Sequence, residues 1–189
     1  MRKQILTISR KEGLSHIGSC LTAYDVIKEI EIGMGPDDVF ILDEGHAGLA
    51  YYVWLEEQGR ANAEELFHKH GVHPNKDENI KVSSGSLGLA GSIALGVALG
   101  NRDRNVYCLT SDGALAEGIW WEVLKIKADR RVDNLKIYVN ANGFSAYDAV
   151  DINELEKRVR AFCPDVIFVR TKVDLPELQG LAGHYAILK

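Results

Sequence analysis

Short apolar runs alternate with longer stretches of helical periodicity along most of this chain. The runs occupy residues 39–42, 105–110, 135–139 and 166–169. Parallel strands need crossover connections of about a dozen residues or more, usually helices, so this spacing favours parallel strands over hairpins. The alternation therefore predicts an α/β fold: a doubly wound, mostly parallel sheet with helices on both faces.

Helical segments are predicted where apolar residues recur every three or four positions. They cover residues 21–31, 49–58, 63–70, 118–130 and 153–162. A further segment, residues 87–99, is apolar on nearly every side and contains three glycines. We expect such a helix to be buried on several sides, either in a large core or in a subunit interface.

Two polar residues come soon after the second and third apolar runs. Asp112 comes after the run at 105–110, and Asn142 comes after the run at 135–139. Ligands of parallel sheets collect at the carboxyl ends of the strands, where both residues would lie. Their oxygens suit a magnesium–diphosphate site, with the Gly113 N–H directed at a phosphate. The alternative is that Asp112 caps the next helix and Asn142 forms a tight turn.

Length, charge and cysteine usage narrow the class of protein. A chain of 189 residues suits one domain. The net charge is −5 with both signs interspersed, which argues against a nucleic-acid or membrane-surface partner. The three cysteines are far apart in sequence and two lie in apolar runs, which indicates buried free thiols in a reducing compartment. Without a signal-peptide pattern or a long apolar run, we expect a soluble, cytoplasmic protein.

Six histidines form the next signal. His68 and His70 lie two apart in a predicted helix, so they point to different faces; this disfavours a transition-metal site, and we expect both to be solvated. His16, His46 and His73 lie instead in predicted loops beside glycine or proline. Such imidazoles can bond hydroxyls and phosphates or transfer protons, although each one alone is more commonly structural.

A glycine-rich segment at residues 85–91 precedes the apolar helix. It lacks the G-x-G-x-x-G pattern, and no clear strand leads into it, so a dinucleotide-binding domain is disfavoured. Two interpretations remain: a glycine-rich entry to a packed helix, or a loop whose backbone lies flat against a ligand.

Together these motifs resemble the diphosphate-binding half of transketolase, from residue 15 to residue 184 and in the family's order. The matching segments are residues 15–18, 40–47, 72–74, 84–88 and 111–113, followed by Glu117, Gly118 and Asn142. Ser86 stands where proline is usual, and Ser111 stands where the first glycine of the thiamine diphosphate signature usually lies. The stretch between residues 142 and 153 is shorter than in typical transketolases, so what it usually covers is expected to be open here or supplied by a partner.

The resemblance implies thiamine diphosphate and Mg²⁺ as cofactors, with Ca²⁺ or Mn²⁺ able to replace the magnesium. The implied metal ligands are Asp112, Asn142 and the Phe144 carbonyl. The implied cofactor-binding residues, of which His46 and Gly113 touch the diphosphate, are His46, Gly85, Ser86, Leu87, Asp112, Gly113 and Asn142.

The same resemblance implies catalytic roles for four residues. His16 and His73 would contact sugar hydroxyls and help to move protons. Glu117 would face the equivalent site of a neighbouring subunit, where it would help to link the two cofactors. His184, within residues 181–185, resembles the last active-site histidine of the family.

On this resemblance, residues 1–189 form a single diphosphate-binding domain, and the pyrimidine-binding domain is absent from the chain. The implied partner is a separate subunit that resembles the C-terminal part of transketolase, in a heterotetramer. The pair would transfer a two-carbon ketol unit from a ketose to an aldose, acting on sugars or sugar phosphates. The chain would be active only with that partner.

Three alternatives stay open. The chain could serve a related thiamine enzyme, either like deoxyxylulose-phosphate synthase or a decarboxylase. It could be a non-catalytic scaffold that keeps the fold, although a scaffold has no need of the histidines and of Asp112. It could also be a plain nucleotide-binding α/β domain.

Overall fold

A single parallel sheet organises the computed structural model, which describes residues 1–145 and 147–188. Its four strands lie side by side in chain order. They are β1 (Val39–Leu42), β2 (Val106–Ser111), β3 (Leu135–Ala141) and β4 (Ile167–Arg170). Every residue of β1 and β2 is buried, as expected for strands covered by helices on both faces. The predicted fold class is confirmed.

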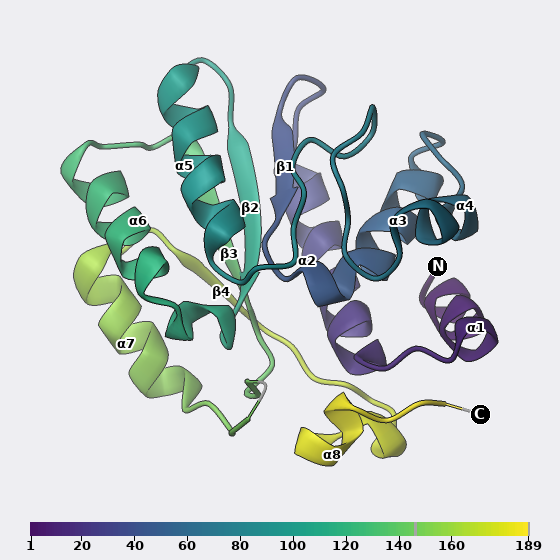
Figure 1. Ribbon diagram of the computed structural model, residues 1–189. Coiled ribbons are helices and arrows are strands. Elements are labelled where there is room, and N and C mark those ends of the chain that lie inside the picture. The colour runs from purple at the N-terminus through teal and green to yellow at the C-terminus, as the bar shows by residue number, and fades with distance from the viewer. Residues whose placement is uncertain (146, 189) are drawn as a thin grey trace.

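Helices cover both faces of this sheet (Figure 1). The eight α-helices are α1 (Arg2–Glu12), α2 (Ile17–Gly33), α3 (Gly48–Glu57), α4 (Ala63–His70), α5 (Leu89–Gly100), α6 (Gly118–Asp129), α7 (Ile152–Phe162) and α8 (Gly180–His184) within the described ranges. On one face α2 packs against β2 and β3, and on the other α5 packs against β1, β2 and β3. Two separate hydrophobic cores result, one on each side of the sheet.

The predicted helices are present, with shifted ends, and α4 matches its predicted range. Helix α1 was not predicted, because its apolar stripe is narrow: only Ile5 and Ile8 bury large side chains. Gly13, in the left-handed conformation with φ 63°, ends this helix, and a glycine just after a periodic segment is a stop signal that the sequence contained.

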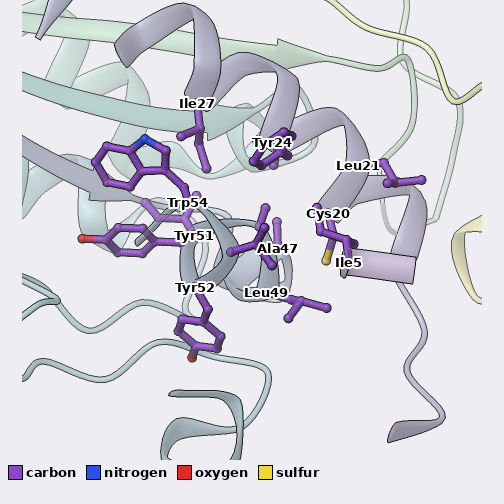
Figure 2. Close-up of a cluster of buried hydrophobic side chains, with 14 of the residues drawn as sticks. Ile5, Cys20, Leu21, Tyr24, Ile27, Ala47, Leu49, Tyr51, Tyr52 and Trp54 are labelled. Atoms are coloured by element: carbon purple, nitrogen blue, oxygen red, sulfur yellow. The ribbon is translucent and has the colours of Figure 1, made fainter. Parts of the chain in front are cut away.

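The core beside α2 and α3 is rich in aromatic side chains. Figure 2 shows Tyr24, Tyr51, Tyr52 and Trp54 gathered with aliphatic residues of both helices. The Tyr51 and Trp54 rings stack with centroids 5.8 Å apart. Aromatic burial of this kind fixes α3, which directly follows the loop after β1, against the sheet.

Helix α5 has two unlike faces. Ala90, Ala94 and Ala98 are buried against the sheet, whereas Leu89, the most exposed apolar residue of α5, keeps 49% of its surface in solvent. Ile93 and Val97 are also exposed and follow Leu89 at intervals of four residues. The core alternative is therefore wrong for the outer face of α5, and the interface alternative stays a prediction.

The three cysteines are buried free thiols, as predicted. Among the described residues, no helix has the length and apolar character needed to cross a membrane.

Candidate functional site

The carboxyl ends of β2 and β3 place Asp112 and Asn142 at the same edge of the sheet. The Asp112 N–H donates to the Asn140 carbonyl at 3.3 Å, which ties the two strand ends together. The Gly143 N–H donates to Asp112 Oδ2 at 2.6 Å, and the Phe144 N–H donates to Asn142 Oδ1 at 3.0 Å. The turn at residues 142–144 therefore closes onto the Asp112 carboxylate.

Gly113 lets this turn approach closely. Its N–H donates to Asp112 Oδ1 at 2.9 Å. A Cβ at this position would lie 3.1 Å from the Ser145 Cα and 3.6 Å from the Phe144 carbonyl oxygen. The Asp112 carboxylate and the Phe144 carbonyl thus both lie near Gly113, and Asn142 belongs to the same turn, so these three residues form one cluster.

The chemistry of this cluster fits a divalent cation. Asp112 is buried, and burial raises the pKa of its carboxyl group to about 6, against the opposing effect of the backbone N–H groups of Gly143 and Gly113. Among the described side chains, none of the lysines or arginines forms an ion pair with it. A buried carboxylate without a counter-ion beside amide and carbonyl oxygens matches the hard ligands that Mg²⁺ prefers.

Four of the predicted site histidines gather beside this cluster. The ring centroids of His16 and His184 lie 4.5 Å apart, those of His16 and His46 lie 5.4 Å apart, and those of His46 and His184 lie 6.1 Å apart. The His73 ring lies against Gly85, since a Cβ there would be 3.3 Å from the His73 Cγ. Three loops and α8, far apart in sequence, therefore bring their imidazoles to one place.

His16 is held in an uncommon backbone conformation. Its φ of 60° lies in the left-handed region, which non-glycine residues rarely adopt. Its N–H donates to the His184 carbonyl at 3.1 Å, and the Ser15 hydroxyl lies 2.8 Å from its Nδ1. Backbone strain of this kind persists only where the surroundings impose it, and it is common at functional sites.

Burial favours the uncharged form of three of these imidazoles, those of His16, His46 and His184. It lowers the pKa of His46 to about 3, with the neighbouring His16 and His184 acting in the same direction. Burial likewise lowers the pKa of His16 and of His184. A neutral imidazole carries one donor and one acceptor, so this cluster suits hydroxyl groups better than it suits bare anions.

The other two histidines lie outside the cluster. His68 is exposed, as predicted, and its Nε2 lies 3.1 Å from Glu12 Oε1. The prediction of a solvated His70 is wrong: its side chain is only 5% exposed, and its Nε2 lies 2.8 Å from Asp77 Oδ2. Asp77 lies in the loop beyond the end of α4, so the helical pattern alone could not identify this partner.

A cavity of about 300 Å³ lies beside the histidines, and neither lysine nor arginine is among the described residues that line it. Its lining residues are His16, His46, Gly85, Leu87, Ser111, Gly113, Ala116, Glu117, Phe144, Ser145, Tyr147 and His184. Most of the predicted site residues are in this set, but Ser86, His73, Asp112 and Asn142 are not. Asn142 instead lines a neighbouring cavity of about 210 Å³, which shares Phe144 and His184 with the first.

Lys172 is a lining residue that was not predicted from the sequence. It lines the smaller cavity, two residues beyond the end of β4. The signal was present, because a polar residue after the carboxyl end of a parallel strand is what identified Asp112. Ser145 and Tyr147 were not predicted either, and both lie in the loop after β3.

Two buried carboxyl groups directly after β1 hold neighbouring elements of the site in place. Asp43 accepts hydrogen bonds from the N–H groups of Gly88 (3.1 Å) and Ala90 (3.2 Å), so it holds the start of α5. Glu44 is fully buried and accepts from the Asn140 Nδ2 at 3.2 Å. The Asp43 bonds fix the loop before α5, which supplies Gly85 to the cavity.

Glycine at position 45 completes the packing of these loops. A Cβ there would lie 2.6 Å from the Gly85 nitrogen, a distance that real side chains do not show. The loop after β1 and the glycine-rich loop before α5 are therefore in direct backbone contact. Of the two interpretations of residues 85–91, the packed entry to α5 is supported, because a Cβ at Gly88 or Gly91 would lie 2.6 Å from Ile119 or 2.7 Å from Trp120. Gly85 and Leu87 line the larger cavity, and their contact with a ligand stays a prediction.

Comparison with known proteins gives consistent matches. A family model described as 1-deoxy-D-xylulose-5-phosphate synthase matches residues 1–172. One subunit of the apulose-4-phosphate transketolase of Actinobacillus succinogenes is 31% identical over 146 residues, which cover 68% of this chain and 52% of that protein. Human transketolase is 32% identical over 167 residues, covering 78% of this chain and 27% of that protein.

A solved structure shares the fold. The transketolase of Campylobacter jejuni superposes with a TM-score of 0.68 at 19% identity, covering 90% of this chain and 37% of that chain. The chain thus spans about half the length of the matched apulose-4-phosphate transketolase polypeptide and about a quarter of the length of human transketolase.

Proposed function

Because the chain belongs to the transketolase-type family of thiamine diphosphate enzymes, and corresponds to its N-terminal domain, we propose that it binds the diphosphate end of that cofactor. The observation that carries the proposal is the meeting of Asp112, Asn142 and four histidines at the carboxyl edge of the sheet. Family membership implies thiamine diphosphate with a divalent metal.

In this proposal Asp112, Asn142 and the Phe144 carbonyl hold Mg²⁺, which Ca²⁺ or Mn²⁺ can replace. The burial of Asp112 without a cationic partner among the described side chains supports this set, whereas the turn at residues 142–144 fits the structural alternative equally well. Gly113 and His46 contact the diphosphate, since both line the larger cavity. The charge of the diphosphate needs a metal here, because burial lowers the pKa of His46 to about 3 and the described lining of the cavity holds neither lysine nor arginine. Gly85, Ser86 and Leu87 border the rest of the cofactor.

When bound, thiamine diphosphate supplies a carbanion stabiliser for cleavage and formation of bonds next to a carbonyl. His16, His73 and His184 then orient the hydroxyl groups of a ketose or an aldose and hold or move their protons. Neutral imidazoles can donate to one hydroxyl and accept from another, which the lowered pKa of His16 and of His184 supports. The reaction transfers a two-carbon ketol unit between sugars.

We also propose that residues 1–189 form one diphosphate-binding domain that works with a separate pyrimidine-domain subunit in a heterotetramer. A relative whose name describes it as one subunit of a transketolase supports a split enzyme. The exposed outer face of α5, formed by Leu89, Ile93 and Val97, is the proposed contact with the partner. Glu117, exposed at the larger cavity, would reach toward a neighbouring subunit.

Reconstitution tests this proposal. The purified chain should show no ketol transfer by itself, and transfer should appear when a pyrimidine-domain subunit is added with thiamine diphosphate and Mg²⁺. Complete turnover by the chain alone would contradict the need for a partner. Absence of turnover with every transketolase-type partner that binds the chain would contradict the catalytic proposal.

The docking face has its own test. Ile93→Glu should weaken partner binding at least tenfold, because it places a charge in the proposed apolar contact. Ile32→Glu is the matched control, since Ile32 is 87% exposed on α2, away from this face. Analytical ultracentrifugation of the mixed subunits measures both. If both variants lost partner affinity equally, or if neither lost any, the interface would not be formed by this face of α5.

A second candidate is a synthase of the deoxyxylulose-phosphate type, because the matching family model has that description. Such an enzyme releases CO₂ from pyruvate, whereas ketol transfer does not. Labelled pyruvate supplied to the reconstituted enzyme therefore separates the two activities.

A further inference from the structure

The other end of the sheet holds a cavity of about 400 Å³ that the proposed function does not use. It lies at the amino ends of the strands, since Val39 and Phe40, the first residues of β1, line it. Arg104 reaches it from the turn before β2. Arg60, just after α3, and Lys81, in the loop before α5, complete a set of three cations from separate segments.

These cations are free to bind an anion. Within residues 1–145 and 147–188, none of the three side chains forms a hydrogen bond or an ion pair. One carboxylate of the lining is already engaged: Asp38 accepts from the Gly35 N–H at 2.9 Å and from the Asn105 N–H at 3.0 Å. The described lining thus holds three cations and two carboxylates, Asp37 and Asp38, which gives it a net charge of +1 in a chain of net charge −5.

The side chains that line the amino-end cavity indicate which class of anion it can bind. Tyr51 and Trp54 line the cavity but are only 3% and 4% exposed, and each ring is packed against the other. They therefore present too little surface to stack a nucleobase, which argues against nucleotide recognition by stacking. Guanidinium and ammonium groups around a polar hollow of this size instead favour phosphate groups, because arginine pairs with phosphate oxygens bidentately.

We propose that this cavity binds a small phosphorylated metabolite with at least two negative charges, held by Arg60, Lys81 and Arg104. The loop that carries Lys81 continues into Gly85, whose contacts with the His73 ring and the Gly45 backbone belong to the other end of the sheet. The ligand thus touches a loop that borders both cavities. The proposal does not depend on the thiamine diphosphate assignment.

Amide NMR mapping of the full chain, titrated with inorganic pyrophosphate in EDTA, tests the site. We expect saturable shifts at the amides of Asp37, Asn79, Lys81 and Arg104. Any second set of shifts at Gly113 and Gly143 would report binding at the other end of the sheet, and its affinity is fitted separately.

Two double variants make the test specific. Arg60→Ala with Lys81→Ala should weaken pyrophosphate binding at these amides at least tenfold. Lys3→Ala with Arg130→Ala removes the same charge from exposed positions outside the cavity, and it should leave that affinity unchanged. Equal weakening in both variants, or shifts that rise linearly without saturation, would overturn the proposal, because only general charge attraction would then be at work.

Discussion

The two ends of the parallel sheet differ in how far their ionisable side chains are exposed to water. At the carboxyl end, Asp112 and His46 are buried. Burial raises the pKa of Asp112 and lowers that of His46, so it favours the uncharged form of each. At the amino end, the side chains of Arg60, Lys81 and Arg104 remain exposed to water. Burial penalises charge, so a diphosphate at the carboxyl end would need the metal that we propose, whereas the exposed cations of the amino end would attract an anion directly.

The substitution with the largest expected effect is at Asp112, and it tests whether the carboxyl end holds a metal. Asp112→Ala should weaken metal-dependent thiamine diphosphate binding by about 100-fold or more, beyond the effect typical of residues that only support a metal ligand. The fold should persist, because the variant removes a buried carboxyl group whose raised pKa indicates an unfavourable charge. Isothermal titration calorimetry with and without Mg²⁺ measures the affinity.

Asp148→Ala is the matched control for that variant. Asp148 is exposed in the same loop, and its hydrogen bonds to Ser145 are made by its backbone N–H and carbonyl rather than by its carboxylate. Its replacement should leave cofactor affinity unchanged. Unchanged affinity in Asp112→Ala, or equal loss in both variants, would mean that the metal ligands lie elsewhere.

The next prediction compares how tightly the two ends of the sheet are packed, through the free energy of unfolding of two glycine variants. Gly45→Ala should lower the free energy of unfolding by about 1–3 kcal/mol, because its Cβ would lie 2.6 Å from backbone at the carboxyl end. Gly35→Ala, at the amino end, would place a Cβ 3.6 Å from Asp38 Oδ2, which is an ordinary contact, and should change stability by about 0.5 kcal/mol or less. Urea denaturation compares the two, and equal stability would show that the loops at the carboxyl end can separate without cost.

The last comparison concerns the pH dependence of stability. His46 has a folded pKa of about 3, below the ordinary value of about 6.5, so the unfolded state binds the extra proton between these values. Its contribution to stability is therefore present above about pH 6.5 and is lost as the pH falls toward 3. Asp112 acts in the opposite sense, because its folded pKa of about 6 is raised: its contribution falls as the pH rises from 3.8 to 6.

Denaturation curves between pH 4 and 7 separate these contributions. His46→Gln should flatten the loss of stability on acidification, whereas the exposed His68→Gln should not. A profile in His46→Gln identical to that of the natural chain would mean that His46 is not buried as a neutral imidazole.

Local patterns predicted the part of the site that depends on strand ends. Asp112 and Asn142 could be placed because parallel strands deliver the residues after them to one edge of the sheet. Lys172 obeys the same rule after β4 and could have been found in the same way.

Long-range partners could not be identified from local patterns. The burial of His70 depends on Asp77, and the support of α5 depends on Asp43, which lies 45 residues from Gly88. The amino-end cations come from residues 60, 81 and 104, and no periodicity in the sequence links such positions. The exposure of the outer face of α5 also could not be predicted from the sequence. An apolar helix shows the same pattern whether its second face packs in a core or lies at the surface of the chain.

The most direct test of the central claim locates the metal itself. Mn²⁺ added with thiamine diphosphate should broaden the amide NMR signals of Gly113, Gly143 and Phe144, and it should leave those of Lys81 and Arg104 sharp. Among the described residues, the ligand atoms of Glu12, Glu64 and His68 lie close enough together to hold a metal ion, although Lys11 already pairs with Glu64. Broadening centred on that group, or none near Gly113, would contradict a metal–diphosphate site at the carboxyl end of the sheet.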